Sequence, residues 1–294
     1  MSTAGALLER VNRQLLSGTV EERNKLSAGV SASDTSFVMS YDLKGLREGT
    51  VFEIDSELCY IWAVTSGTKT VEVERGYAGT TATTHSADAI VTLNPRFPKA
   101  QMLEALNQDI DDLSSPVNGL FRVVATDVVY NGSDRQIDLT GATDVIDLID
   151  VRLRYLADDY PVLRGVRLQR NLPTSDFPSG LALVFDEGTI AGSLRVRYKA
   201  PFTRASSTSS DIQTACFIPT SMEDILEMGV MIRMMQTREV KRNFIESQGD
   251  TRRSDEVPAG AIRDSFTNIM RMRRDRIIAE KAKLARQIPL TIRV

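Results

Sequence analysis

The sequence predicts an α+β protein with two antiparallel β modules, a small barrel and a jelly-roll-like sandwich, plus a helical C-terminal region. Three observations predict this fold class. Short, alternating apolar runs fill residues 33–93 and 120–199, and apolar residues at three- and four-residue spacing occur before, between and after them. The charge balance also changes: residues 1–220 carry 21 basic and 28 acidic side chains, whereas residues 221–294 carry 15 and 11.

The overall composition excludes several classes of protein. The 294 residues are 42% hydrophobic and 26% charged, as in ordinary globular proteins, and the formal charge of −3 excludes a strongly basic nucleic-acid coat. No apolar run reaches the length of a membrane span, and charges interrupt the N-terminal pattern, so we expect neither a membrane segment nor a signal peptide. One histidine and two distant cysteines favour a protein without cofactor, metal or disulfide framework.

The first predicted element is an N-terminal helix within residues 1–20, where Leu7, Val11 and Leu15 recur at helical spacing. Residues 21–116 are predicted to form the small β module with a following helix. Its strands are separated by turn signals such as Gly45 and Gly49, and Gly76 and Gly79 are expected to form a tight turn with positive φ. The helix spans 100–113, between Pro98 and Pro116.

Residues 117–204 are predicted to form the sandwich, because apolar and basic residues alternate in segments such as LRVRYKA. The Ser- and Thr-rich residues 205–220 are predicted to be a polar linker. Residues 221–288 form the helical region, with a capping box of Thr220 and Glu223, a helix to about Ile245 and a longer helix from Ala259 to Gln287. Residues 289–294 are predicted to be a terminal strand or tail.

No catalytic motif is present, neither a nucleophile elbow nor a phosphate loop nor a dinucleotide-binding glycine pattern, which favours a protein that is not an enzyme. His85 could act as a base, but no nucleophile stands near it in the sequence, so a structural role is favoured. The acidic groups 109–112 and 144–150 could bind calcium or form a carboxylate pair, but solvated surface is favoured because neither has ligand-loop spacing. Cys59 and Cys216 stand among apolar residues and are expected to be buried and inert.

Candidate partner-binding residues lie in the C-terminal region. Met231 and Met234 fall off the apolar stripe of their helix, which leaves apolar surface for a neighbour, although core packing is the alternative. Basic residues including Arg273, Arg274 and Arg276 occur along the long helix, where they contact an acidic partner or phosphates, or simply face solvent.

The terminal tail adds three more candidates. Leu290, Ile292 and Val294 share one face of a short strand that Pro289 separates from the helix. Its backbone groups have no local partner, so we expect it either to pair with a neighbouring subunit or to be a frayed end.

One stretch resembles a known class of protein. Arg75, Gly76, Tyr77, Gly79, Thr80 and His85, followed by Asn94, Pro95, Arg96 and Phe97, resemble the strand-rich segment of neck and head-to-tail connector proteins of tailed bacteriophages. Residues 223–286 are similar in character to the helical part of such proteins. The resemblance implies a virion structural protein made in the host cytoplasm and located in the neck, where a ring, by resemblance twelvefold, docks beneath the portal protein and surrounds the DNA channel.

The resemblance also implies the partners: further copies of the chain, the portal protein, downstream neck or tail proteins and, through proximity only, DNA. Two alternatives remain open within the virion, a tail or baseplate component and a glycan- or receptor-binding module. Sugar-binding surfaces favour exposed Trp and Tyr, yet the single tryptophan, Trp62, lies outside the predicted sandwich.

Overall fold

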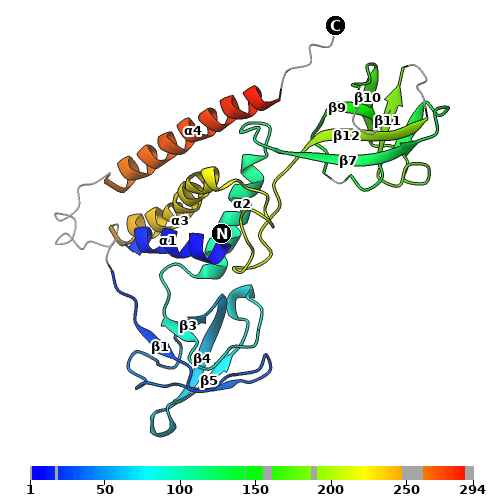
Figure 1. Cartoon of the computed structure of the whole chain (residues 1–294). Coiled ribbons are helices and arrows are strands. Elements are labelled where there is room, and N and C mark those ends of the chain that lie inside the picture. Colours follow the sequence, from blue (N-terminus) through cyan, green and yellow to red (C-terminus); the bar gives the residue numbers. More distant parts are fainter. Residues whose placement is uncertain are drawn as a thin grey trace. The chain divides into compact units, whose positions relative to one another are not determined.

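The computed structural model describes residues 2–16, 19–142, 144–154, 161–186, 191–246 and 261–288. These residues form a mixed α+β protein with four α-helices, one six-stranded sheet and two three-stranded sheets (Figure 1). The chain divides into unit 1, made of Met1–Ile110 and Arg204–Val294, and unit 2, Asp111–Thr203. The predicted fold class is confirmed at this level. In this division the helical region falls in the same unit as the small β module.

Helix α1 (Ala4–Leu16) confirms the predicted N-terminal helix. Its buried apolar residues are Ala4, Leu7, Leu8 and Val11. They recur at three- and four-residue steps, so they share the face that packs into unit 1. A short helix of this kind is marginal alone, and its stability comes from this packing.

The segment predicted as a linker is ordered and pairs with the start of α1. Three apolar residues in it, Ile212, Cys216 and Ile218, are fully buried. The amides of Ala4 and Gly5 donate to the carbonyls of Ser210 and Thr208 at 2.8 and 2.7 Å. The linker prediction was therefore wrong, because the Ser-rich composition concealed a backbone that satisfies the free amides of a helix N-terminus.

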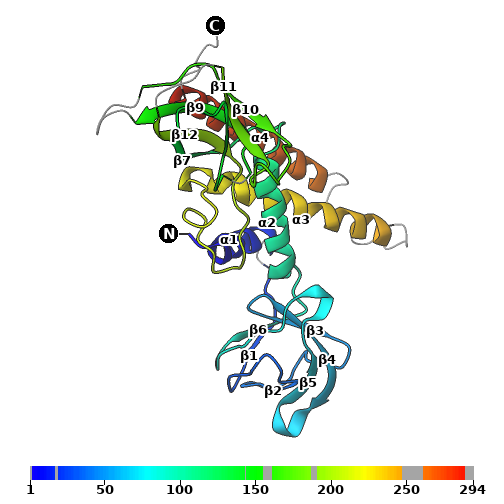
Figure 2. The same ribbon diagram turned by 90° about the vertical axis from the view of Figure 1, so that its right-hand side faces the viewer.

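The small β module is one curled antiparallel sheet, a half-barrel in the order β1-β6-β3-β4-β5-β2 (Figure 2). Its strands are β1 (Arg23–Lys25), β2 (Ser36–Val38), β3 (Val51–Ile54), β4 (Glu57–Thr65), β5 (Thr70–Glu74) and β6 (Ile90–Leu93). The inner face holds the core, in which the rings of Phe37 and Phe52 lie 6.1 Å apart. The register of β4 against β5 shifts between Ile61 and Ala63, at the position of Trp62.

A tight turn follows β5 where the sequence predicted one. Gly76 and Gly79 have φ angles of 64° and 82°, in the left-handed region that favours glycine. A Cβ atom on Gly76 would lie 2.9 Å from the carbonyl oxygen of Thr80, so a side chain does not fit there. The prediction that these glycines form a tight turn with positive φ is confirmed.

Helix α2 (Lys99–Leu113) follows the β module, one residue earlier than predicted. The buried carboxylate of Glu53, on β3, accepts a hydrogen bond from the backbone amide of Lys99. This bond satisfies one of the amides that a helix leaves free at its start. Met102, Leu106 and Ile110 are buried along one side of the helix, as their spacing predicts.

Unit 2 contains two three-stranded antiparallel sheets, in the orders β7-β12-β9 and β10-β11-β8. The strands are β7 (Arg122–Tyr130), β8 (Gln136–Asp138), β9 (Asp147–Arg154), β10 (Val166–Arg170), β11 (Leu181–Phe185) and β12 (Gly192–Ala200). Both sheets contribute to one core, where the rings of Tyr130 and Phe185 stack at 4.8 Å. The described residues of this unit thus hold six strands, whereas a jelly roll has eight.

The C-terminal helices are α3 (Glu223–Glu246) and α4 (Ala261–Gln287). A 3₁₀ turn (Thr220–Met222) precedes α3, and no side chain caps it. The predicted capping box is therefore absent, because the Glu223 side chain is hydrogen-bonded to Arg10 on α1. The long helix begins two residues later than predicted. The predicted terminal strand, 289–294, lies outside the described residues.

Candidate partner interface

Ion pairs fix α1 against α3. The Arg10 guanidinium donates from Nε to Glu227 at 2.6 Å and from Nη2 to Glu223 at 2.7 Å. All three side chains are only partly exposed. Two charge-assisted bonds from one planar group hold a defined geometry, so these helices have a fixed relative position.

A buried carboxylate connects α2 with α3 and α4. Asp109, on α2, is 1% exposed and accepts a hydrogen bond from Arg273 of α4 at 2.7 Å. Its carboxyl group lies directly over Gly229 of α3, where any Cβ atom would overlap it. The expectation that Asp109 belongs to a solvated acidic surface was wrong, because a cation 164 residues away in the chain neutralises it.

Arg276 holds α4 to the start of α3. Its guanidinium donates to Asp224 at 2.6 Å and to the carbonyl of Ser221 at 2.8 Å. The bonds to Asp224 raise the pKa of Arg276, although partial burial opposes the shift. Arg273 and Arg276, predicted as partner contacts, are thus engaged within the chain.

The other predicted interface residues are placed differently. Met234 is buried and Met231 is half-buried, so the expectation that Met234 leaves apolar surface for a neighbour was wrong. The stripe of buried apolar residues on α3 is wider than predicted, because it also includes Val230 and Met234. Arg274 is exposed, as an interface residue should be. The three tail residues, Leu290, Ile292 and Val294, lie outside the described part of the chain.

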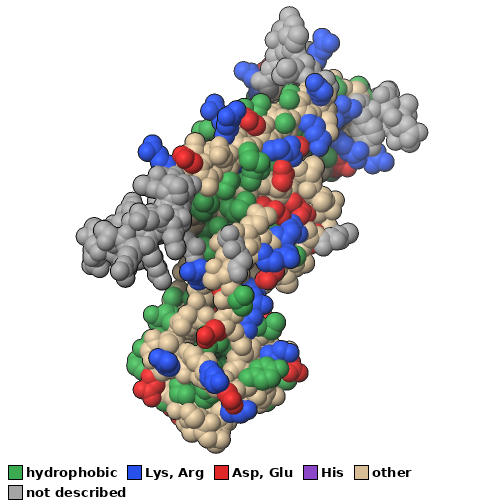
Figure 3. Space-filling model, turned by 90° about the vertical axis from the view of Figure 1, so that its left-hand side faces the viewer, with side chains coloured by type: hydrophobic (Ala, Val, Ile, Leu, Met, Phe, Trp, Pro, Cys, Tyr) green, Lys and Arg blue, Asp and Glu red, His purple; other side chains and the backbone are tan. Residues whose placement is uncertain are grey.

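Three large apolar side chains are exposed on α4 among mostly polar and charged residues. Among its residues 263–287, only Ile277 and Glu280 are buried. Met270, Met272 and Ile278 are 49%, 60% and 53% exposed. On the face of the molecule drawn in Figure 3, Lys and Arg side chains border a hydrophobic patch. Mixed apolar and basic surface is typical of a protein-binding region.

A second group of charged residues lies inside the β module, around Glu57 at the start of β4. Arg75 donates to the two Glu57 oxygens from Nε and Nη2, at 2.6 and 2.8 Å. The amides of Gly76 and Thr83 donate to the same carboxylate at 3.1 and 3.0 Å. His85 contacts it through Nε2 at 2.8 Å, and its Nδ1 lies 2.8 Å from Asp55.

This environment shifts the pKa values of both groups. Burial alone would raise the pKa of Glu57. The bonds from Arg75, the Thr83 amide, His85 and the Gly76 amide outweigh this effect, and the pKa is lowered to about 2. Burial lowers the pKa of His85, but the hydrogen bonds with Asp55 and Glu57 raise it more, so the net shift is upward. Each ring nitrogen faces a carboxylate, an arrangement that favours the doubly protonated imidazolium.

The arrangement supports structure rather than proton transfer. The His85 side chain is fully buried and both nitrogens are occupied, so no substrate atom can reach them. Arg75 also donates to the carbonyls of Ser31, Asp34 and Thr83. Residues 75–80 and His85 therefore hold the surrounding hairpin and loops together around the Glu57 carboxylate.

Exposed aromatic rings lie on the outer face of the same sheet. The Tyr60 ring contacts Trp62 edge-to-face at 4.9 Å and lies 5.4 Å from Tyr77. Trp62 is 61% exposed. Tyr60 pairs across the strands with Glu74, so acidic and aromatic side chains are neighbours there. In the sequence, Trp62 is conspicuous only as the single tryptophan outside the predicted sandwich, but the alternation of residues along β4 already places Tyr60 and Trp62 on one face.

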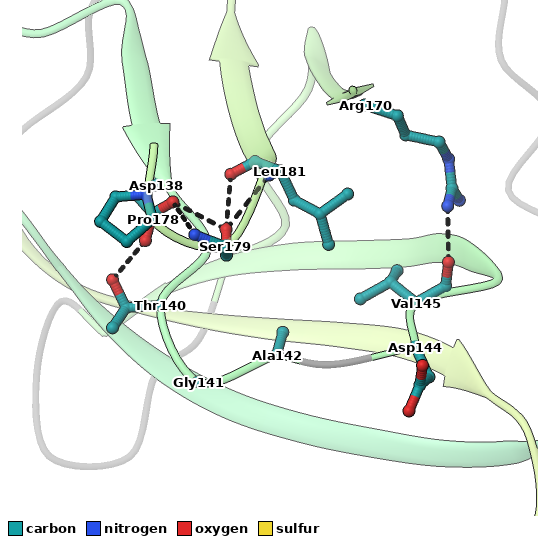
Figure 4. Close-up of a pocket in the computed structure, with 10 residues that line it drawn as sticks. All are labelled: Asp138, Thr140, Gly141, Ala142, Asp144, Val145, Arg170, Pro178, Ser179 and Leu181. Atoms are coloured by element: carbon teal, nitrogen blue, oxygen red, sulfur yellow. Dashed lines mark hydrogen bonds between the residues drawn. The ribbon is translucent and has the colours of Figure 1, made fainter. Parts of the chain in front are cut away.

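An open hollow of about 620 Å³ lies in unit 2 (Figure 4). Asp138 accepts hydrogen bonds from the hydroxyls of Ser179 and Thr140, both at 2.7 Å. Arg170 donates to the carbonyls of Val145 and Ile146 at 2.6 Å. The polar groups that line the hollow thus bind one another.

Other features of the described residues bear on chemistry. No cluster of three or more His, Cys, Asp or Glu residues in the described ranges has the arrangement of a metal site. The described helices include none that is both long and apolar enough to cross a bilayer. Cys59 and Cys216 are buried thiols, as expected, and burial beside Glu57 raises the pKa of Cys59 to about 12. Such a thiol is a poor nucleophile at neutral pH.

No known family model matches the chain, and no curated protein is similar to it.

Proposed function

We propose that this chain is a structural virion protein of a tailed bacteriophage, a head-to-tail adaptor. Its copies form a ring beneath the portal protein and join capsid to tail around the DNA channel. The observation that carries the proposal is the exposure of α4, a 27-residue helix that buries only two of its side chains between residues 263 and 287. Ion pairs hold α4 on one side, and a helix with so many exposed side chains on its other sides has surface available for further contacts.

Two further observations support an assembly role. The exposed apolar residues of α4 lie among arginines, which is the composition of protein-binding surface. The residues that resemble the connector class, Arg75 to Thr80 with His85, all serve the internal architecture of the β module. Such contacts make the β module rigid, and a structural part of a virion needs a rigid fold but no reactive group. The neck location, the twelvefold symmetry and the portal partner come from the resemblance alone.

Ring formation is tested with the purified full-length chain, alone and with the portal protein of the same phage. We expect the chain alone to be monomeric or weakly associated in mass photometry at low concentration. Rings should form on the portal and be visible in electron micrographs. A chain that stays monomeric in the presence of portal would overturn the proposal. A stable ring without portal would leave the adaptor role standing but contradict the expected dependence on portal.

Antibody labelling of intact particles separates the neck from other positions. The adaptor proposal expects label at the junction of head and tail. Label at the distal end of the tail would instead support a tail or baseplate component.

A glycan- or receptor-binding virion module is the second candidate. The exposed ring cluster of Tyr60, Trp62 and Tyr77 favours it, because pyranose rings stack on such surfaces. Carboxylates such as that of Glu74 accept hydrogen bonds from sugar hydroxyl groups. Saturable quenching of Trp62 fluorescence by a host glycan would support this candidate.

A further inference from the structure

Two exposed surfaces of unit 1 have opposite charge and matching apolar content. The first, here called the acidic aromatic patch, consists of Tyr60, Trp62, Glu72, Glu74 and Tyr77. Val71 and Val73 of β5 point into the core, so Glu72 and Glu74 lie on the outer face with Tyr60. Neither glutamate forms an ion pair with another described residue, so the patch presents uncompensated negative charge beside aromatic rings.

The second surface, here called the basic helix face, consists of Met270, Arg271, Met272, Arg274 and Ile278. Helical spacing puts Arg271 and Ile278 on the side of α4 opposite the buried Ile277 and Glu280, with Arg274 and Met272 on its two flanks. Met270 lies nearer the buried side but is still 49% exposed. Arg271 and Arg274 form no ion pair within the described part of the chain. Asp275 lies on the same side, and the two arginines outnumber it.

We propose that the acidic aromatic patch of one chain binds the basic helix face of the next copy in the ring. This inference rests on the proposed function, because it names the contact by which the ring would close. The chemistry of the two surfaces matches in three ways. Arginine pairs with carboxylates, guanidinium groups stack over aromatic rings, and methionine sulfur packs favourably against ring edges.

The occupant is a second copy because each surface lacks what the other supplies. A contact of either surface with its own twin would bring like charges together, which opposes association. A contact between two different surfaces is heterologous, and such contacts generate closed rings when the rotation between subunits closes.

Charge reversal tests this contact. One variant of the full-length chain carries Glu72→Arg and Glu74→Arg, a second carries Arg271→Glu and Arg274→Glu, and a third carries all four changes. Self-association is measured by sedimentation velocity at high protein concentration and by ring counts on portal. We expect each two-site variant to associate at least about tenfold more weakly, and the four-site variant to recover. An equal mixture of the two-site variants should also recover, because each then offers the other an oppositely charged surface.

Matched controls separate this contact from general charge effects. Arg13→Glu on α1 and Glu104→Arg on α2 reverse exposed charges outside both surfaces and should leave association unchanged. Circular dichroism melting checks that every variant is folded. Rings that form normally in both two-site variants would overturn this contact while the adaptor role stands. Saturable quenching of Trp62 fluorescence by a glycan that leaves self-association of the wild-type chain unchanged would also overturn this contact. A wild-type chain that never assembles would overturn both the contact and the adaptor role.

Discussion

Glu57 and His85 lie 2.8 Å apart, with both side chains fully withdrawn from solvent, although 28 residues separate them in the chain. The carboxylate also receives Arg75 and two backbone amides. It is therefore the centre of the β module's polar interior. A buried carboxylate with this many donors is stable only while all of them stay in place.

The His85 pair makes the stability of unit 1 depend on pH. The pKa of His85 is raised in the folded protein, so its contribution is complete below the unfolded value of about 6.5 and is lost as pH rises through the folded pKa. We expect His85→Gln to destabilise the protein at pH 5.5 and to do so less at high pH. Urea unfolding followed by Trp62 fluorescence measures this, because the only tryptophan lies in the same module. A constant difference across pH would contradict the assignment.

Removing Arg75 should be far more disruptive than removing an exposed ion pair. Arg75 and Glu57 are 7% and 1% exposed, so Arg75→Ala removes two charge-assisted bonds from a buried carboxylate, and we expect a loss of about 3–5 kcal/mol in unfolding free energy. Arg75→Lys should recover only part of this loss, because an ammonium cannot donate to both oxygens in one plane. Asp42→Asn removes the exposed pair with Lys69 and should change stability by less than about 1 kcal/mol.

The buried Glu53 should respond to pH in a different range. Burial raises its pKa to about 7, while the bond from the Lys99 amide opposes that shift. Ionisation of this carboxyl group therefore lowers stability as pH rises from about 4.5 to 7. Glu53→Gln should equal the wild type near pH 4 and exceed it by about 1–3 kcal/mol at pH 8. A variant that is less stable at pH 8 would show that the charged form is needed at the start of α2.

Gly229 should tolerate no side chain. In an exposed helix, Gly→Ala raises stability by about 0.5–1 kcal/mol, but at this position the new methyl group would overlap the Asp109 carboxylate. We expect Gly229→Ala to lower the melting temperature and the unfolding free energy, by about 1–3 kcal/mol. Gly67→Ala is the matched control, since nothing lies within 4 Å of its added carbon. Equal effects at the two positions would count against the packing of α2 on α3.

The sequence predicted what depends on local spacing. The helices α1 and α2, the positive φ angles of Gly76 and Gly79 and the burial of both cysteines follow from periodicity and residue type. The ionic contacts could not be predicted this way. His85 meets Glu57 across a hairpin, and Asp109 meets Arg273 across most of the chain, so only the tertiary fold determines these pairs. Arg273 and Arg276 looked like surface residues because their partners are distant in sequence.

The pairing of residues 2–5 with residues 208–212 has a consequence for the order of folding. The sandwich is complete in the nascent chain before α3 and α4 have been synthesised, so it can fold while α1 still lacks its neighbours. Helix α1 can pack only after α3 has been synthesised, and contacts between segments so far apart in the chain form slowly. The contacts of α1 with residues 208–212 and with α3 thus form only after the whole of unit 2 has been synthesised, so the packing of unit 1 is completed after that of unit 2 can be.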